Sequence, residues 1–253
     1  MTAETWMHQA LEEARRGVGR TAPNPPVGAV VVQDGQLVAA ASHPGPGAFH
    51  AERLALVAAG ERARGADLYC TLEPCCHHGR TPPCTEIIIA SGVRRVWYGS
   101  ADPDPRVAGQ GEAALRAAGI EVTAGCLVEA TDALYEPYFK HKRTGRPFLT
   151  LKLACSLDGR VATATGHSRW ITGAATRRRV HAWRDEAEAV LVGVGTVLAD
   201  DPQLTVRPAP ADGRQPLRVV ADTQARTPVT ARLLREPGDT LIAVAETAPA
   251  EQA

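Results

Sequence analysis

The pattern of apolar and polar positions in the first 140 residues predicts alternating helices and strands. Apolar side chains recur at helical spacing in residues 6–14, 50–59, 85–90, 111–118 and 127–140. Short aliphatic runs predict strands at 27–32, 37–42, 67–71 and 93–98, and the Asp34-Gly35 pair is a hairpin turn signal. This order of elements predicts an α/β fold, in which helices flank a mixed sheet.

A basic, turn-rich stretch at 141–147 predicts a linker between two domains. Beyond it, residues 148–153 open a second α/β unit, with a helix expected at 174–184 and later strands at 189–192, 217–220 and 240–244. The predicted domains are therefore residues 1–145 and 146–253. The second is short and ends soon after a predicted strand, so we expect it to be incomplete.

Charge and hydropathy exclude several classes of protein. The chain has 253 residues, with 28 Lys+Arg against 28 Asp+Glu, whereas a broad nucleic-acid binder normally carries a basic excess. No apolar run approaches the roughly 18 residues that a membrane helix needs. The N-terminus lacks the basic and apolar regions of a signal peptide. We expect a cytoplasmic protein without nucleic-acid or membrane partners.

Candidate metal chemistry lies in two short segments. Four of the six cysteines fall within fifteen positions, which favours metal binding or catalysis over disulfides in a chain without a secretory signal. The His50-Ala51-Glu52 triplet begins a predicted helix. One imidazole and two thiolates suit Zn²⁺, which in catalytic sites keeps a position for water and lowers its pKa to ~7. Glu52 can then move a proton without ligating, as in zinc-dependent base deaminases.

The spacing of the cysteines leaves the ligand set open. Eight residues separate Cys75 from Cys84, where the deaminase pattern has two. On chemistry alone, rival ligands are Cys76, His77 and His78. Cys84 follows two prolines that begin a predicted helix, and the positive N-terminus of that helix favours a thiolate. A closed structural zinc site is the alternative, but such a site needs no acid/base like the one in the His-x-Glu triplet.

Several motifs resemble the bifunctional deaminase/reductase family of riboflavin biosynthesis. They are NPPVG at 24–28, HAE at 50–52, TLEPCCHHGRTPPC at 71–84, LKLACSLDGR at 151–160, SRWIT at 168–172, TVLADDP at 196–202 and LTVR at 204–207. The resemblance implies a cytidine-deaminase-like first domain, followed by a partial dihydrofolate-reductase-like α/β domain. It also selects His50, Cys75 and Cys84 as zinc ligands and Glu52 as the catalytic acid/base. Cys76 stands where the family usually has serine.

For the first domain, the resemblance implies hydrolytic deamination of a small molecule. The substrate would be 2,5-diamino-6-(5-phosphoribosylamino)pyrimidin-4(3H)-one, and the products 5-amino-6-(5-phosphoribosylamino)uracil and ammonia. Asn24 and His43 match family positions that hold the base. His77 and Arg80 match positions near the substrate, where Arg80 can pair with the 5′-phosphate.

For the second domain, the resemblance implies NADPH-dependent reduction of the ribosyl group to a ribityl chain. Family positions for NADPH fall on Ala154, Trp170, Thr196, Asp200 and Thr223; those for the substrate fall on Ser168, Arg184, Leu204 and Arg207. The family's reductase domain continues further, with an acidic substrate residue and a Gly-rich cofactor stretch. We therefore expect weak or absent reductase activity in a chain that stops at residue 253. The family often associates through this domain, so a homo-oligomer is compatible with the resemblance.

Two other functions remain as alternatives. A nucleic-acid base deaminase shares the zinc chemistry, but it should show basic stripes with stacking aromatics, and this chain is only 4% aromatic with zero net charge. A structural zinc module with a non-catalytic nucleotide-binding domain would need a fourth protein ligand on the metal.

Overall fold

The computed structural model of the chain describes residues 1–248 and divides it into two compact units, Met1–Thr150 and Leu151–Ala253. Each unit has its own sheet. The last five positions of the predicted second domain, 249–253, lie outside the described residues. Among the residues described, no helix is long and apolar enough to span a bilayer.

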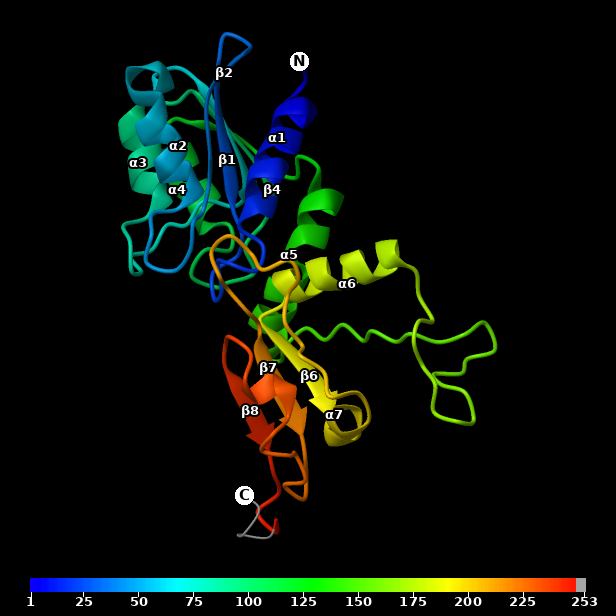
Figure 1. Cartoon of the computed structure of the whole chain (residues 1–253). Helices are drawn as coiled ribbons and strands as arrows, with labels where there is room; N and C mark the ends of the chain where they lie inside the picture. Colours follow the sequence, from blue (N-terminus) through cyan, green and yellow to red (C-terminus); the bar gives the residue numbers. More distant parts are fainter. Residues whose placement is uncertain (249–253) are drawn as a thin grey trace. The chain divides into compact units, whose positions relative to one another are not determined.

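The sheet of the first unit has five strands in the order β2-β1-β3-β4-β5 (Figure 1). The strands are β1 (Gly28–Gln33), β2 (Gln36–Ser42), β3 (Asp67–Leu72), β4 (Arg95–Ser100) and β5 (Glu121–Thr123). β1 pairs antiparallel with β2 and β3, whereas β3 and β5 run parallel to β4. The predicted mixed sheet is therefore confirmed, while β5, only three residues long, was not predicted.

The helices of the first unit are α1 (Ala3–Arg16), α2 (Ala51–Ala59), α3 (Cys84–Ser91), α4 (Gln110–Ala117) and α5 (Val128–Thr144), with a 3-10 turn at Gly60–Ala63. α1 packs against β1 on one face of the sheet, and α2 covers the other (Figure 1). α5 continues to Thr144 and ends at Gly145, whose φ is 67°. The first part of the predicted linker at 141–147 is therefore helical, and that part of the expectation was wrong.

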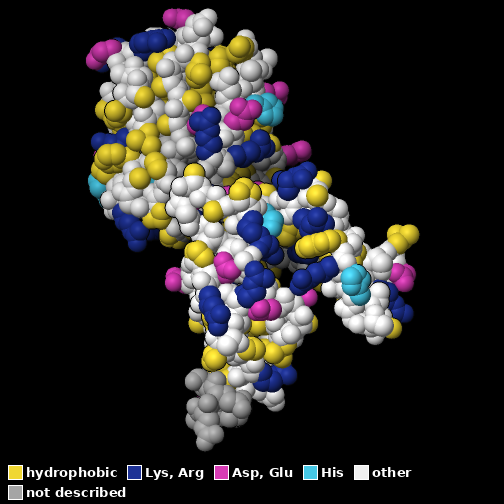
Figure 2. All heavy atoms as spheres, viewed as in Figure 1, with side chains coloured by type: hydrophobic (Ala, Val, Ile, Leu, Met, Phe, Trp, Pro, Cys, Tyr) yellow, Lys and Arg dark blue, Asp and Glu magenta, His cyan; other side chains and the backbone are white. Residues whose placement is uncertain are grey.

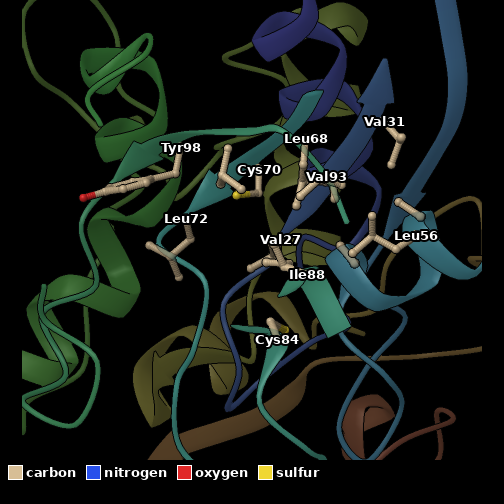
Figure 3. Close-up of a cluster of buried hydrophobic side chains, with 14 of the residues drawn as sticks. Val27, Val31, Leu56, Leu68, Cys70, Leu72, Cys84, Ile88, Val93 and Tyr98 are labelled. Carbon is tan, nitrogen blue, oxygen red and sulfur yellow. The ribbon is translucent and has the colours of Figure 1, made fainter. Parts of the chain in front are cut away.

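The core of the first unit lies on both faces of the sheet. Ala29 and Val31 of β1 join the cluster beneath α2 and α3, and Val30 joins the cluster beneath α1. Figure 3 shows side chains of the larger cluster directed toward one another. Burial on both faces explains why β1 is almost continuously apolar. A Cβ on Gly28 would lie 2.0 Å from the Ala10 carbonyl oxygen, so the close approach of α1 to β1 requires glycine.

The second unit contains three parallel strands in the order β6-β7-β8. Its elements are α6 (Ala174–Glu186), β6 (Ala189–Gly193), α7 (Val194–Asp200), β7 (Leu217–Ala221), a 3-10 turn at Arg232–Leu234 and β8 (Thr240–Ala243). The structure has no strand at 148–153, where one was expected. The alternating residues Leu149, Leu151 and Leu153 are 79%, 83% and 69% exposed. An alternating segment forms a strand only beside a partner strand, and residues 148–153 pair with no strand among the described residues.

Candidate functional site

Three segments of the first unit bring one histidine and two cysteines together. His50 is the extended N-cap residue of α2, and Cys84 is the first residue of α3. Cys75 lies in the loop that follows β3. One potential ligand atom from each residue lies within 4.8 Å of the other two, and Cys84 itself is buried. The site therefore depends on the β3–α3 connection folding back onto the start of α2.

The distances among these atoms fit a tetrahedral zinc ion. His50 Nδ1 lies 3.5 Å from Cys75 Sγ and 3.3 Å from Cys84 Sγ. Zinc bond lengths of about 2.0–2.1 Å to nitrogen and about 2.3 Å to sulfur place tetrahedral N and S ligands about 3.6 Å apart. A site with three protein ligands leaves the fourth position to water or substrate, as catalytic zinc sites do.

The rival ligands considered from the sequence make other contacts. Cys76 Sγ donates to the Arg106 carbonyl oxygen at 3.3 Å, and the exposed His78 Nε2 lies 3.6 Å from a Glu86 carboxylate oxygen. His77 is half-buried, and its Nδ1 has no hydrogen-bond partner among the described residues. The ligand atoms that cluster are those of His50, Cys75 and Cys84.

Hydrogen bonding prepares Cys75 as a thiolate. A bond from the Cys84 side chain, assisted by His50, lowers the pKa of Cys75 to about 4. The Cys84 main-chain N–H also donates to Cys75 Sγ at 3.4 Å. The thiolate is the form that ligates a metal, so Cys75 is ionised for this role at neutral pH. The bond to Cys75 also raises the pKa of His50 to about 9 and raises the pKa of Cys84, so metal binding would displace protons from both groups.

Glu52 is the buried acid beside these ligands. It lies in the first turn of α2, is only 3% exposed, and its Oε2 has no hydrogen-bond partner among the described residues. Burial raises the pKa of its carboxyl group. A buried polar atom without a partner is costly and indicates a missing partner such as a substrate or water. A raised pKa makes the carboxylate a stronger base, which suits a group that accepts and returns a proton.

Asn24 and His43 form a connected pair next to the ligands. His43 follows β2, is 2% exposed, and its ring packs edge-on against that of His50 with centroids 5.2 Å apart. Its Nδ1 lies 3.2 Å from the Phe49 carbonyl oxygen, and its Nε2 lies 3.1 Å from Asn24 Nδ2. Because a carbonyl only accepts, Nδ1 carries the proton and Nε2 accepts from Asn24. This leaves the Asn24 Oδ1 available to accept a hydrogen bond.

Arg80, unlike Asn24 and His43, is exposed. It lies in the loop between Cys75 and Cys84. His77 lies in the same loop, two positions beyond Cys75. Their assignment to the substrate therefore stays a prediction.

A cavity of about 710 Å³ gathers most of the residues predicted for the second unit. Eight of the nine line it, namely Ala154, Ser168, Trp170, Arg184, Thr196, Asp200, Leu204 and Arg207. Thr223 follows β7 and is not among the lining residues. The segments that supply these residues lie up to about fifty positions apart in the chain, yet they share one concave surface, which is the usual form of a small-molecule site.

Sequence reasoning missed two other residues on this surface. Arg177 lies over the Trp170 ring at 4.3 Å, and His181 Nδ1 accepts the main-chain N–H of Arg207 at 3.1 Å. Both line the cavity together with Arg184. Positions 177, 181 and 184 share one face of α6, so the helical spacing is the signal that could have found them. Figure 2 shows Lys and Arg side chains gathered on the second unit around α6.

The cationic side chains in this cavity repel one another. Burial and the nearby Arg207 both lower the pKa of Arg184. Its Nη1 donates to the Thr205 carbonyl oxygen at 3.1 Å, which holds the guanidinium in place. An anion between two neighbouring guanidinium groups relieves their repulsion, and the planar bidentate donors of arginine match a phosphate.

Two family models match the chain. The cytidine and deoxycytidylate deaminase zinc-binding region matches residues 1–100, and the RibD C-terminal domain matches residues 147–253. The riboflavin biosynthesis protein RibD of Escherichia coli K12 is 46% identical, over 96% of this chain and 69% of its own length. That of Actinobacillus pleuropneumoniae is 47% identical over 93% of this chain, which spans only 62% of that relative's length.

A solved structure is also similar along most of the chain. It is the Thermotoga maritima diaminohydroxyphosphoribosylaminopyrimidine deaminase/5-amino-6-(5-phosphoribosylamino)uracil reductase, with a TM-score of 0.90 and 45% identity. The match covers 97% of this chain and 70% of that structure. Its extent supports the expected order of a deaminase-like unit followed by a reductase-like unit.

Proposed function

Since this chain belongs to the RibD family of riboflavin biosynthesis proteins, we propose that its first unit is a zinc-dependent pyrimidine deaminase. The substrate would be 2,5-diamino-6-(5-phosphoribosylamino)pyrimidin-4(3H)-one, whose C2 amino group is exchanged for oxygen with release of ammonia. The observation that carries the proposal is the buried Glu52 carboxylate, with its unpartnered Oε2, beside a His/Cys/Cys cluster. A closed structural site would have no use for that carboxylate. We assign this activity to residues 1–145 and the reductase-like function to residues 146–253.

The proposed mechanism gives each residue of the first unit a separate task. The zinc would be held by His50, Cys75 and Cys84. When bound, zinc acts as a Lewis acid that lowers the pKa of a coordinated water to about 7. Glu52 would accept one proton from the attacking water and pass it to the ring nitrogen, and would then take the remaining hydroxyl proton and pass it to the departing amine. The net change is one water consumed and one ammonia released.

Asn24 and His43 orient the base in this proposal. Burial lowers the pKa of His43, which keeps its ring neutral and its Nε2 an acceptor for Asn24. The Asn24 amide is thereby held so that its oxygen can accept from an N–H of the pyrimidine. His77 and Arg80 would approach the ribose 5′-phosphate, for which the guanidinium of Arg80 is the suited donor.

For the second unit, we propose that the cavity binds NADPH and the deaminated ribotide. Ala154, Trp170, Thr196, Asp200 and Thr223 would contact the cofactor. Ser168, Arg184, Leu204 and Arg207 would contact the ribotide, with the two arginines on its phosphate. Hydride transfer from NADPH, with a proton from water, would reduce the open-chain ribosyl carbonyl to the ribityl alcohol.

Location and assembly are part of the same proposal. A cytoplasmic location suits the free thiols that the metal site requires, because a reducing compartment preserves them. Association into a homo-oligomer stays a prediction from the resemblance, and light scattering measures it.

One experiment tests both units. Zinc-loaded protein is incubated with the diaminopyrimidinone ribotide, with and without NADPH, and the products are separated by mass. We expect the deaminated ribotide in both samples, and about 10²- to 10⁴-fold slower formation of it by Glu52→Gln. The absence of any deaminated product from zinc-loaded protein would refute the deaminase proposal. A reduced product formed only with NADPH would establish the second activity, and its absence would count against assigning that activity to this chain.

A further inference from the structure

A buried carboxylate outside the metal cluster lies two residues before Cys75. Glu73 follows β3 and is only 3% exposed. Its Oε2 accepts the main-chain N–H of Gly109 at 3.1 Å and that of Asp102 at 3.4 Å, and its Oε1 accepts that of Glu112 at 3.3 Å. All three donors belong to the segment between the end of β4 and the first turn of α4. The carboxylate thus binds one continuous segment by three charge-assisted bonds.

The same segment contacts the chain on both sides of Cys75. The Glu73 main-chain N–H donates to the Ser100 carbonyl oxygen at 2.9 Å, and the Cys76 thiol donates to the Arg106 carbonyl oxygen. A Cβ on Gly111 would lie 2.1 Å from the Pro74 carbonyl oxygen, so α4 packs directly on the residue that precedes the ligand. Residues 100–112 therefore form a backing for the loop that carries Cys75, and we call them the backing segment.

The position of Cys75 depends on this contact because little else fixes the loop on that side. Its carbonyl oxygen accepts the Thr85 main-chain N–H at 3.1 Å, which joins it to the start of α3. Toward the N-terminus, the next fixed point is the end of β3, where Leu72 pairs with Ser100 and the Glu73 main-chain N–H bonds the Ser100 carbonyl oxygen. Glu73 and Pro74 are the only residues between that pair and Cys75. Movement of either one displaces the thiolate.

We propose that Glu73 is a positioning residue for the metal ligand Cys75, acting through the backing segment. The inference rests on the proposed function, because it takes Cys75 to be a ligand. Loss of the carboxylate would leave three main-chain N–H donors, of which that of Asp102 is buried, short of an acceptor and would free the backing segment from the loop. The ligand would then be presented less accurately to the metal. For comparison, groups that hydrogen-bond a metal ligand directly typically contribute about 10- to 100-fold in metal affinity.

The test compares variants at the two ends of β3. Glu73→Gln replaces the acceptor with an amide that cannot accept all three bonds. Asp67→Asn is the matched control, because Asp67 is also a buried carboxylate on β3 and bonds Arg95 at 2.6 Å and Arg94 at 3.3 Å. Co²⁺ is the probe, and its absorption bands report the geometry of the two thiolate ligands. Dissociation constants for Co²⁺ and melting temperatures of the metal-free proteins are measured in parallel.

We expect both variants to melt earlier, but only Glu73→Gln to shift the cobalt bands and to raise the dissociation constant by about 10-fold or more. Unchanged bands and affinity in a folded Glu73→Gln protein would overturn the proposal and leave Glu73 a purely structural residue. Gly111→Ala provides a second route if Glu73→Gln does not fold, because the new Cβ presses on Pro74 without removing a charge. It should also shift the bands, and normal bands in it would count equally against the proposal. Wild-type protein without any thiolate–cobalt spectrum would instead refute the proposed metal site.

Discussion

The exchange of Glu52 for glutamine separates a catalytic role from a structural one. The carboxyl group is 3% exposed, and its Oε2 lacks a partner among the described residues, so an amide of equal size fits without losing a bond at that atom. Positioned acid/base groups typically contribute about 10²- to 10⁴-fold in rate, equivalent to about 3–5 kcal/mol of activation free energy. We expect ammonia release to fall by that factor while one zinc per chain is retained.

The stability of the same variant should change in the opposite direction. Burial raises the pKa of Glu52, so the folded state holds its proton more tightly than the unfolded state does. Stability is then lost as the pH rises from the unfolded pKa through the folded pKa, because an ionised carboxylate is buried. A neutral amide does not ionise. Chelator-treated Glu52→Gln should therefore unfold at a higher denaturant concentration than wild type at neutral pH.

The assay follows ammonia release and zinc content in parallel for three proteins. They are wild type, Glu52→Gln and a control, Glu61→Gln, which makes the same charge change at an exposed position just beyond α2. The control should match wild type in both measurements. Retained turnover in Glu52→Gln would remove this carboxyl from the mechanism, and loss of zinc along with activity would make it a ligand instead.

Three further predictions address packing, acid stability and the second unit. Gly28→Ala should destabilise the fold by about 1–3 kcal/mol in denaturant titrations, because the new Cβ would lie 2.0 Å from the Ala10 carbonyl oxygen; an unchanged midpoint would contradict the close packing of α1 on β1. Arg106 and Lys142 hold the pKa of Asp104 well below its usual range, so its contribution is present above about pH 4 and is lost as the pH falls through the folded pKa. Asp104→Asn should therefore lower stability at pH 7 more than at pH 2, and an equal loss at both would refute that reasoning. Arg184→Met should weaken binding of ribose 5-phosphate in calorimetry without altering deamination, and unchanged binding would remove Arg184 from the anion site.

The sequence predicted the long periodic elements better than the short ones. Helices with a clear apolar stripe, such as α1, and the apolar strands β1 and β3 were expected within a few residues of where they lie. β5 and α7 are three and seven residues long, which is too short for an alternating or a helical pattern of apolar residues to be recognised. The strand expected at 148–153 is absent for a different reason. Alternating apolar and polar residues indicate that a strand is possible, but they do not show that a partner strand is present.

Prediction of the candidate site divides in a similar way. Residue types and their order predicted a metal site but left rival ligands open, the family resemblance selected His50, Cys75 and Cys84, and the structure brings these three together. The role proposed for Glu73 was not readable, because its partners are main-chain N–H groups 29 to 39 positions further along the chain. Every residue type except proline has a main-chain N–H, so such bonds cannot be predicted from residue types. The fold is needed to distinguish Glu73 from any other acidic residue at the end of a strand.

A net charge of zero conceals a local excess of positive charge. Around the cavity of the second unit, the charged side chains are Lys152, Arg169, Arg177, Arg184, Arg207 and Arg232 against Asp200 and Asp201. The zero net charge argued against a long polyanion as substrate. The local excess of cations around the cavity is compatible with a small anion. A phosphate monoester would engage two or three of these cations, whereas a nucleic acid would need a continuous basic track. Anion binding should therefore weaken only gently with added salt, and a steep dependence would favour the nucleic-acid alternative.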